Sequence, residues 1–217
     1  MKHFIDKEMA APNVMRVPVA PDIVAEFAEP AVSELPRADY VTSRPSWKSD
    51  VRWIAARSQP AFDRFETAFH RLGIAGHVAP YLDLEKEVRL YAGFLVIRTE
   101  CSEPDFHLDW FGTNNEGFTL ITPVSANAAG FGLLYRRIDG KPAEYEYRLG
   151  EAIVFGDHFV HSTRPGRSEE PVVLLSFTFG TDRMEHWDKL IRTAGHHAGL
   201  IRRPDGVMVS RPAVRRG

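Results

Sequence analysis

The chain has 217 residues, of which 44% are hydrophobic and 26% are charged, and its formal net charge at pH 7 is −2. This length suits one domain with a real core, and all-β barrels and sandwiches commonly reach it. A nearly neutral chain has no global field that would attract nucleic acid or an anionic membrane, so neither partner is expected.

Two features of the sequence concern the location of the protein. The single cysteine, Cys101, fits a reducing compartment because it leaves no partner for an internal disulfide. The N-terminal residues lack the apolar stretch of a signal peptide, and no window approaches the roughly 18 apolar residues of a membrane span. A cytoplasmic protein is therefore expected.

The first 45 residues contain six prolines and are expected to wrap the domain as loops and edge strands such as VMRVPVA, without long helices. Residues 46–87 are expected to support the domain with helices, because helical patterns run from 47 to 57 and from 61 to 72. The second pattern has a stripe typical of a core-facing helix side, made of Phe62, Phe65, Phe69 and Leu72.

From Val88 to residue 181 the hydrophobic period changes to two, and glycine, proline, aspartate and asparagine separate short runs. This pattern predicts a mainly β protein with flanking helices, whose core is a jelly-roll or cupin-like barrel. The expected strands are 88–99, 105–110, 117–124, 131–138, 144–149, 151–156, 158–163 and 171–180.

The C-terminal part, residues 182–217, is expected to hold a helix over 182–194, with Asp182 as its cap and Gly195 as its end. The tail that follows Leu200 is basic. It is expected to be solvated or to contact another subunit, with nucleic-acid binding as the weaker alternative. The whole chain, 1–217, is read as a single domain.

Two polar residues stand close together in the aromatic stretch DFHLDWFG, where His107 and Asp109 are two residues apart. Side chains alternate along a strand, so both point to the same face. A lone buried carboxylate is very costly, and a divalent metal would satisfy both groups. The alternative for an isolated H-x-D is an ordinary hydrogen-bonded pair.

A third polar group follows in GEAIVFGDHFVHSTRPG, where His161 opens a later strand of the barrel. Two histidines and one carboxylate leave metal positions open, the arrangement associated with non-haem Fe(II) oxygenases. No thiolate lies nearby in the pattern, which disfavours a structural zinc site. His158 competes as the third ligand, but its position relative to Phe155 favours His161.

The order H-x-D, then GEAIVF and HST, then a last hydrophobic strand resembles the Fe(II)/2-oxoglutarate-dependent dioxygenases of the phytanoyl-hydroxylase kind, over residues 88–181. The resemblance implies a double-stranded β-helix and Fe(II) held by His107, Asp109 and His161. It also implies oxidation of a small molecule, with hydroxylation as the expected outcome and with 2-oxoglutarate and O2 converted to succinate and CO2. Asp109 argues against halogenation, which in related enzymes needs a small residue there.

The sequence departs from this family at the residue that holds the distal carboxylate of 2-oxoglutarate. Family members usually carry an arginine at the start of the last strand, where this chain reads Glu170-Pro171-Val172. Arginine suits the task because its guanidinium binds a carboxylate in a bidentate manner. The bases that could replace it are Arg164, Arg167, Arg136 and Arg137, and the hydroxyls that could assist are those of Tyr91, Thr119 and Thr122, which could equally be wall residues.

Other residues near the H-x-D pair are candidates for substrate contact. Trp110 and Phe111 either pack in the wall or shape the mouth of the site, and the polar loop 112–117 adjoins the expected metal edge. Because the family arginine is absent, two alternatives stay open. One is a cupin-like metalloenzyme that does not use 2-oxoglutarate, and the other is a non-enzymatic jelly-roll binding module.

Overall fold

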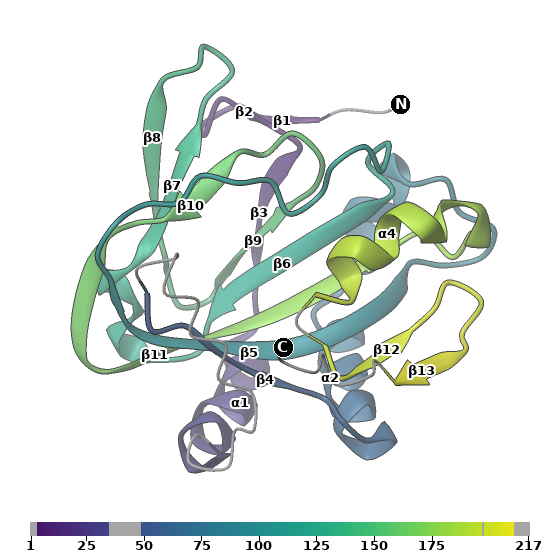
Figure 1. Cartoon of the computed structure of the whole chain (residues 1–217), viewed down its shortest axis with the longest axis horizontal. Helices are drawn as coiled ribbons and strands as arrows, with labels where there is room; N and C mark the ends of the chain where they lie inside the picture. Colours follow the sequence, from purple (N-terminus) through teal and green to yellow (C-terminus); the bar gives the residue numbers. More distant parts are fainter. Residues whose placement is uncertain (1–3, 35–48, 197, 211–217) are drawn as a thin grey trace, which may run out of the picture.

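The computed structural model describes residues 4–34, 49–196 and 198–210. Two antiparallel sheets face each other across the interior (Figure 1). The larger has the strand order β3 (Val14–Pro18), β9 (Glu151–Phe155), β6 (Gly117–Pro123), β11 (Gly166–Gly180), β5 (Arg89–Cys101) and β4 (Arg52–Ala55). The smaller has the order β10 (His161–Thr163), β7 (Gly132–Arg136) and β8 (Pro142–Glu146).

Shorter elements surround these sheets. The helices are α1 (Pro21–Glu34), α2 (Gln59–Arg71), α3 (Ile74–Val78) and α4 (Trp187–Ala194), with short 3-10 turns at Ala79–Tyr81, Ala126–Gly130 and Met184–His186. Two small antiparallel pairs are β1 (Ile5–Asp6) with β2 (Ala11–Pro12) and β12 (Leu200–Arg202) with β13 (Met208–Ser210). The expected mainly β protein with flanking helices and a double-stranded β-helix is confirmed.

Alternation along the strands divides the core into two layers. On β5, Leu95 and Ile97 pack with the helices on the outer face of the larger sheet, whereas Phe94 and Val96 point into the space between the sheets. Figure 1 shows α1 and α2 together on that outer face. The interior therefore receives every second residue of each strand, and these residues line the candidate site.

The α2 helix follows from its sequence. Ser58 caps its N-terminus by accepting the backbone N–H of Ala61, and a proline occupies the first turn. The predicted stripe is buried against the sheet, and a Cβ on Gly93 would lie 2.5 Å from Phe65. Each buried phenylalanine stabilises this layer by about 1.5–3 kcal/mol. The glycine thus allows close contact between helix and strand.

Two expectations for the N-terminal part were wrong. The segment expected to lack long helices contains the 14-residue α1, because Pro21 occupies its first turn and Ile23, Val24 and Phe27 are buried against the core. The helix expected over 47–57 is replaced by β4, whose Trp53 pairs with Val96 of β5. Pairing with a neighbouring strand outweighed the local helical pattern. Residues 35–48 lie outside the described part.

Two further expectations change in the second half of the chain. Residues 105–110 form a single bridge at His107 instead of a strand. Asp182 does not cap α4, which begins at Trp187; its carboxylate accepts the backbone N–H groups of residues 85–87. Within the described tail, Arg202 pairs with Glu66 and lies over the Phe62 ring at 4.7 Å. This arginine packs on the domain, and residues 211–217 lie outside the described part.

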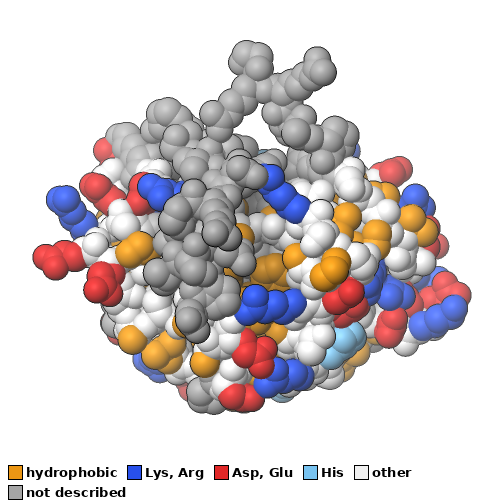
Figure 2. All heavy atoms as spheres, turned by 90° about the horizontal axis from the view of Figure 1, so that it is seen from below, with side chains coloured by type: hydrophobic (Ala, Val, Ile, Leu, Met, Phe, Trp, Pro, Cys, Tyr) orange, Lys and Arg blue, Asp and Glu red, His pale blue; other side chains and the backbone are white. Residues whose placement is uncertain are grey.

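Acidic and basic side chains intermingle on the face seen in Figure 2. That distribution agrees with the small net charge of the chain. Among the described helices, none has the length and apolar character needed to cross a membrane.

Candidate active site

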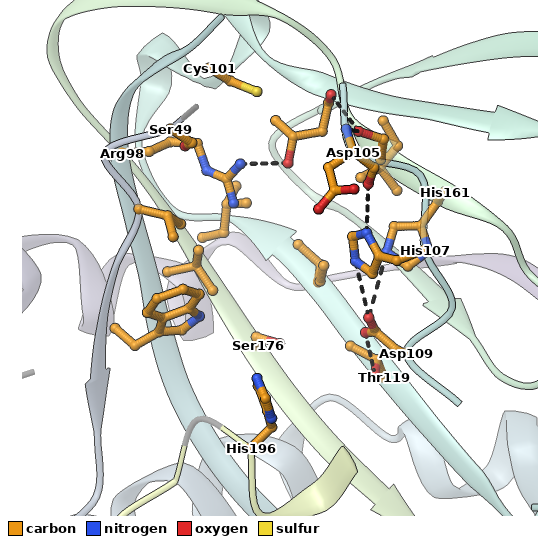
Figure 3. Close-up of a pocket in the computed structure, with 18 of the residues that line it drawn as sticks. Ser49, Arg98, Cys101, Asp105, His107, Asp109, Thr119, His161, Ser176 and His196 are labelled. Atoms are coloured by element: carbon orange, nitrogen blue, oxygen red, sulfur yellow. Dashed lines mark hydrogen bonds and ion pairs between the residues drawn. The ribbon is translucent and has the colours of Figure 1, made fainter. Parts of the chain in front are cut away.

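A cavity of about 270 Å³ lies between the two sheets and extends to α4 (Figure 3). His107, Asp109 and His161 line it on one side, and Arg98 and Tyr147 also face it. Apolar side chains form much of the remaining wall, together with hydroxyls from β6 and β11, and the titratable residues Glu103, Asp105, Arg192 and His196 also line the cavity. The apolar and hydroxyl-bearing residues of the wall include Trp53, Phe94, Val96, Thr119, Ile121, Leu133, Leu174, Ser176 and Thr178.

The two histidines are joined through their backbones. The N–H of His107 donates to the carbonyl of His161 at 2.8 Å, and the N–H of His161 donates to the carbonyl of His107 at 3.0 Å. This reciprocal pair is a single step of an antiparallel ladder. It sets the spacing of the two imidazoles, whose ring centroids are 4.6 Å apart.

The side chains of the three residues converge. The Nε2 atoms of His107 and His161 lie 3.4 Å and 3.8 Å from Oδ1 of Asp109, and one ligand atom from each residue falls within 4.8 Å of the others. Each imidazole has its Nδ1 against a backbone carbonyl two residues earlier, at 2.7 Å for Asp105 and 3.1 Å for Phe159. Nδ1–H donation fixes the tautomer that leaves Nε2 free to bind a metal.

The surroundings shift the pKa of each of the three groups. Burial opposes the charge on Asp109, but the His107 hydrogen bond and both imidazoles hold its pKa well below the usual range. Burial also opposes protonation of His107, yet contact with Asp109 outweighs it and raises that pKa. Burial lowers the pKa of His161 to about 4, against the attraction of Asp109. Near neutral pH the site thus holds a carboxylate and a neutral His161.

His161 is the deeper of the two histidines, with 5% of its side chain exposed, compared with 48% for His107. His158, which competed with it in the sequence, is exposed in a turn with a positive φ of 71° and lies outside the cluster. The structure thus brings together His107, Asp109 and His161, the three residues that the motifs selected.

The sequence did not indicate the second notable group of the cavity, which is Arg98 on β5. Its guanidinium donates to the hydroxyl of Thr163, and its buried Nε has no hydrogen-bond partner among the described residues. Tyr147 lines the same part of the cavity, where burial raises its pKa to about 12 although Arg98 opposes that shift. The Arg98 guanidinium and the protonated phenol of Tyr147 thus face the same part of the cavity.

Of the seven residues expected to hold the co-substrate or assist its binding, Thr119 lines the cavity, and the other six, all within the described ranges, lie elsewhere. Arg164 pairs with Glu144 at 3.4 Å, and Arg167 is exposed. Both mid-barrel arginines are exposed, Arg136 over the Phe106 ring at 4.7 Å and Arg137 beside Asp139 at 3.8 Å. Tyr91 donates to the carbonyl of Thr181, and Thr122 donates to that of Glu151.

The residues that follow His107 and Asp109 were expected near the site, and the structure places them differently from one another. Trp110 is fully buried, and its indole donates to Thr119, which lines the cavity. Phe111 is 81% exposed, and loop 112–117 does not line the cavity. The loop is instead tied to the turn before His161, because Thr113 donates to the buried carboxylate of Asp157 at 2.8 Å. Trp110 therefore packs in the wall.

No protein-family model and no curated protein matches the sequence. Solved structures share its fold, which is that of iron- and 2-oxoglutarate-dependent enzymes. The non-heme alpha-ketoglutarate-dependent epimerase SnoN from nogalamycin biosynthesis has a TM-score of 0.61 and 14% identity, over 78% of this chain and 79% of that chain. The resemblance drawn from the motifs is thus confirmed for the fold.

Two other solved structures are similar to this chain. A Pseudomonas putida prolyl-4-hydroxylase has a TM-score of 0.56 and 17% identity, over 78% of this chain and 92% of that chain. HygX from Streptomyces hygroscopicus, with nickel, 2-oxoglutarate and hygromycin B bound, has a TM-score of 0.57 and 14% identity, over 84% of this chain and 90% of that chain. The names and bound molecules of these neighbours differ, from nogalamycin biosynthesis to a prolyl hydroxylase and bound hygromycin B, so the fold leaves the substrate open.

Proposed function

We propose that the protein is an Fe(II)- and 2-oxoglutarate-dependent oxygenase that acts on a small molecule. The observation that carries this proposal is one cavity that joins a His-Asp-His cluster to an incompletely bonded arginine. The free cysteine, Cys101, supports a cytoplasmic location, where thiols stay reduced.

The residues of the cluster fit the metal. Two imidazole Nε2 atoms and a carboxylate oxygen converge, and both tautomers are fixed through Nδ1. This set of two histidines and a carboxylate is typical of non-haem Fe(II) oxygenases. When bound, the iron supplies the oxidising chemistry with O2 and 2-oxoglutarate, while His107, Asp109 and His161 hold it.

Arg98 is the residue that we propose for the distal carboxylate of 2-oxoglutarate, in place of the four arginines expected from the sequence. It stands opposite Val172 in the pairing of β5 with β11. Val172 belongs to the stretch where the family arginine was expected. The neighbouring strand thus supplies a guanidinium at this position of the barrel. Thr163 and the protonated Tyr147 offer further hydroxyls to the carboxylate.

We propose hydroxylation as the outcome. In the balanced reaction, a C–H bond of the substrate becomes C–OH with one atom of O2. The other atom enters succinate as 2-oxoglutarate loses CO2. The retained carboxylate of Asp109 supports hydroxylation over halogenation, and the apolar side chains of the wall suit an organic substrate.

The test is an anaerobic titration of the purified protein with Fe(II) and then with 2-oxoglutarate. We expect stoichiometric Fe(II) binding and a visible charge-transfer band when 2-oxoglutarate chelates the metal. The folded variant His161→Ala should lose both. Metal binding without the band would favour a cupin-like enzyme that does not use 2-oxoglutarate. No metal binding by the parent would contradict the proposal and favour a binding module.

A further inference from the structure

The two carboxylate oxygens of Asp109 have different surroundings. Oδ1 faces the Nε2 atoms of His107 and His161. Oδ2 accepts a hydrogen bond at 3.1 Å from the hydroxyl of Thr119 on β6. Figure 3 shows Thr119 beside Asp109, on the side away from the imidazoles. One oxygen is therefore engaged by the protein, and the other is directed to the metal-binding cluster.

The Thr119 hydroxyl is itself oriented by Trp110. The indole Nε1–H donates to Thr119 Oγ1 at 2.9 Å, and both side chains are buried. A hydroxyl has one proton and two lone pairs. Because the indole occupies a lone pair, the single proton is left to point toward Asp109. The three side chains thus form a directed chain of donors from Trp110 through Thr119 to Asp109.

The start of this chain has little freedom to move. Trp110 is fully buried, and a Cβ on Gly117 would lie 2.5 Å from its ring. Its neighbours include Leu190 of α4, and Thr193 of the same helix donates to the backbone carbonyl of Asp109. Both the side chain and the backbone of Asp109 are therefore held by residues that do not belong to the metal cluster.

We propose that Thr119 is a positioning residue that, oriented by Trp110, fixes which oxygen of Asp109 is presented to the metal. The inference rests on the metal site of the proposed function. Without the Thr119 hydroxyl, rotation about the χ2 bond of Asp109 has only a broad, roughly two-fold preference. Neither carboxylate oxygen would then be selected to face the metal. Loss of a partner that orients a metal ligand typically lowers metal affinity by about 10–100-fold.

The test is the affinity of the full chain for Mn(II), a probe read by the electron paramagnetic resonance of the free ion. Thr119→Val should weaken Mn(II) binding by about 10–100-fold, and Thr119→Ser, which keeps the hydroxyl, should restore most of it. The matched control is Thr178→Val. Thr178 stands opposite Thr119 in the pairing of β6 with β11, and its buried hydroxyl has no hydrogen-bond partner among the described residues. This control should bind Mn(II) like the parent.

A second variant tests the role of the indole. Trp110→Phe removes the N–H, so it should weaken Mn(II) binding in the parent but add little in the Thr119→Val background. If Thr119→Val does not fold, Trp110→Phe is measured in the parent alone, and a folded variant that binds Mn(II) like the parent would overturn the orienting role of the indole. Equal losses in both backgrounds would show that Trp110 acts only by packing, and would overturn its role.

The remaining outcomes separate this inference from the proposed function. If the parent binds Mn(II) and a folded Thr119→Val binds it equally well, the positioning role is overturned while the metal site stands. Failure of Thr119→Ser to restore affinity would likewise overturn it. If the parent does not bind Mn(II), both the metal site and the inference fail.

Discussion

The two ends of the cavity differ in how completely the protein satisfies their polar groups. At the metal-cluster end, both imidazoles have a carbonyl at Nδ1, and Asp109 is held by Thr119. At the other end, the Arg98 guanidinium meets the hydroxyl of Thr163, and its buried Nε has no partner among the described residues. The protein alone orders the side chains at the metal-cluster end. At the Arg98 end, the guanidinium has hydrogen-bonding capacity left for an anion.

This difference predicts that the two ends bind their ligands separately. Arg98→Met should weaken 2-oxoglutarate binding to the Mn(II)-loaded protein by roughly 30-fold or more, because loss of one partner of a buried charge pair costs about 2–5 kcal/mol. Mn(II) affinity should stay unchanged, since the cluster does not depend on Arg98. Isothermal titration of each ligand measures both effects.

The matched control for this experiment is Arg167→Met, which removes an exposed arginine that the sequence had suggested for the same task. It should bind both ligands like the parent. Equal 2-oxoglutarate affinities for Arg98→Met and the parent would show that another group holds the carboxylate. A parallel loss of Mn(II) affinity would show that the two ends are not separate.

The metal end could be predicted from the sequence because its residues lie in short motifs. His107 and Asp109 are two residues apart, and alternation gives their common face even though they form only one bridge instead of a strand. Arg98 was missed because its role depends on its neighbour in the sheet, Val172, which lies far along the chain. A local signal was present, since Arg98 follows Phe94 and Val96 on the same inward face of an apolar strand.

The fold shows the same limit. Period-two alternation predicted most of the strands from Val88 onward, because it is a pattern of neighbouring residues, but residues 105–110 form only a single bridge. It did not predict β4, which forms because Trp53 meets β5, or α1, whose buried Phe27 packs on the sheet. Elements that depend on a distant partner are decided by tertiary contacts, which the local pattern does not contain.

The incomplete bonding of Arg98 also predicts a gain in stability when it is removed. In the protein without ligands, Arg98→Met should raise the free energy of unfolding by about 1–2 kcal/mol, because an unsatisfied buried polar group costs about 1–3 kcal/mol. Methionine would pack among apolar neighbours such as Val96 and Leu174. Urea unfolding measures the change, and Arg167→Met should stay within about 0.5 kcal/mol of the parent. A less stable Arg98→Met would mean that the guanidinium is well satisfied without an anion.

The smallest expected effect concerns Asp50, which holds β5 directly after Arg98. Its carboxylate accepts the backbone N–H groups of Thr99 and Glu100, each at 2.9 Å, and the Thr99 hydroxyl. Burial alone would raise the pKa of Asp50, but these hydrogen bonds outweigh it and lower the pKa. A lowered carboxyl pKa stabilises the fold above the unfolded value of about 3.9, and this stabilisation is lost as the pH falls through the folded value.

Asp50→Asn should therefore lower the free energy of unfolding by about 1 kcal/mol at pH 7. The gap between parent and variant should stay constant from pH 7 to pH 5 and shrink below about pH 4, as the parent loses its charged hydrogen bonds. Urea unfolding across this pH range measures the gap, and a gap that persists undiminished at pH 3 would contradict the role of the charge.

Because Asp50 acts on the backbone beside Arg98, its loss should weaken 2-oxoglutarate binding far less than Arg98→Met does. An equal loss would mean that the placement of β5, rather than the guanidinium itself, limits binding at this end of the cavity.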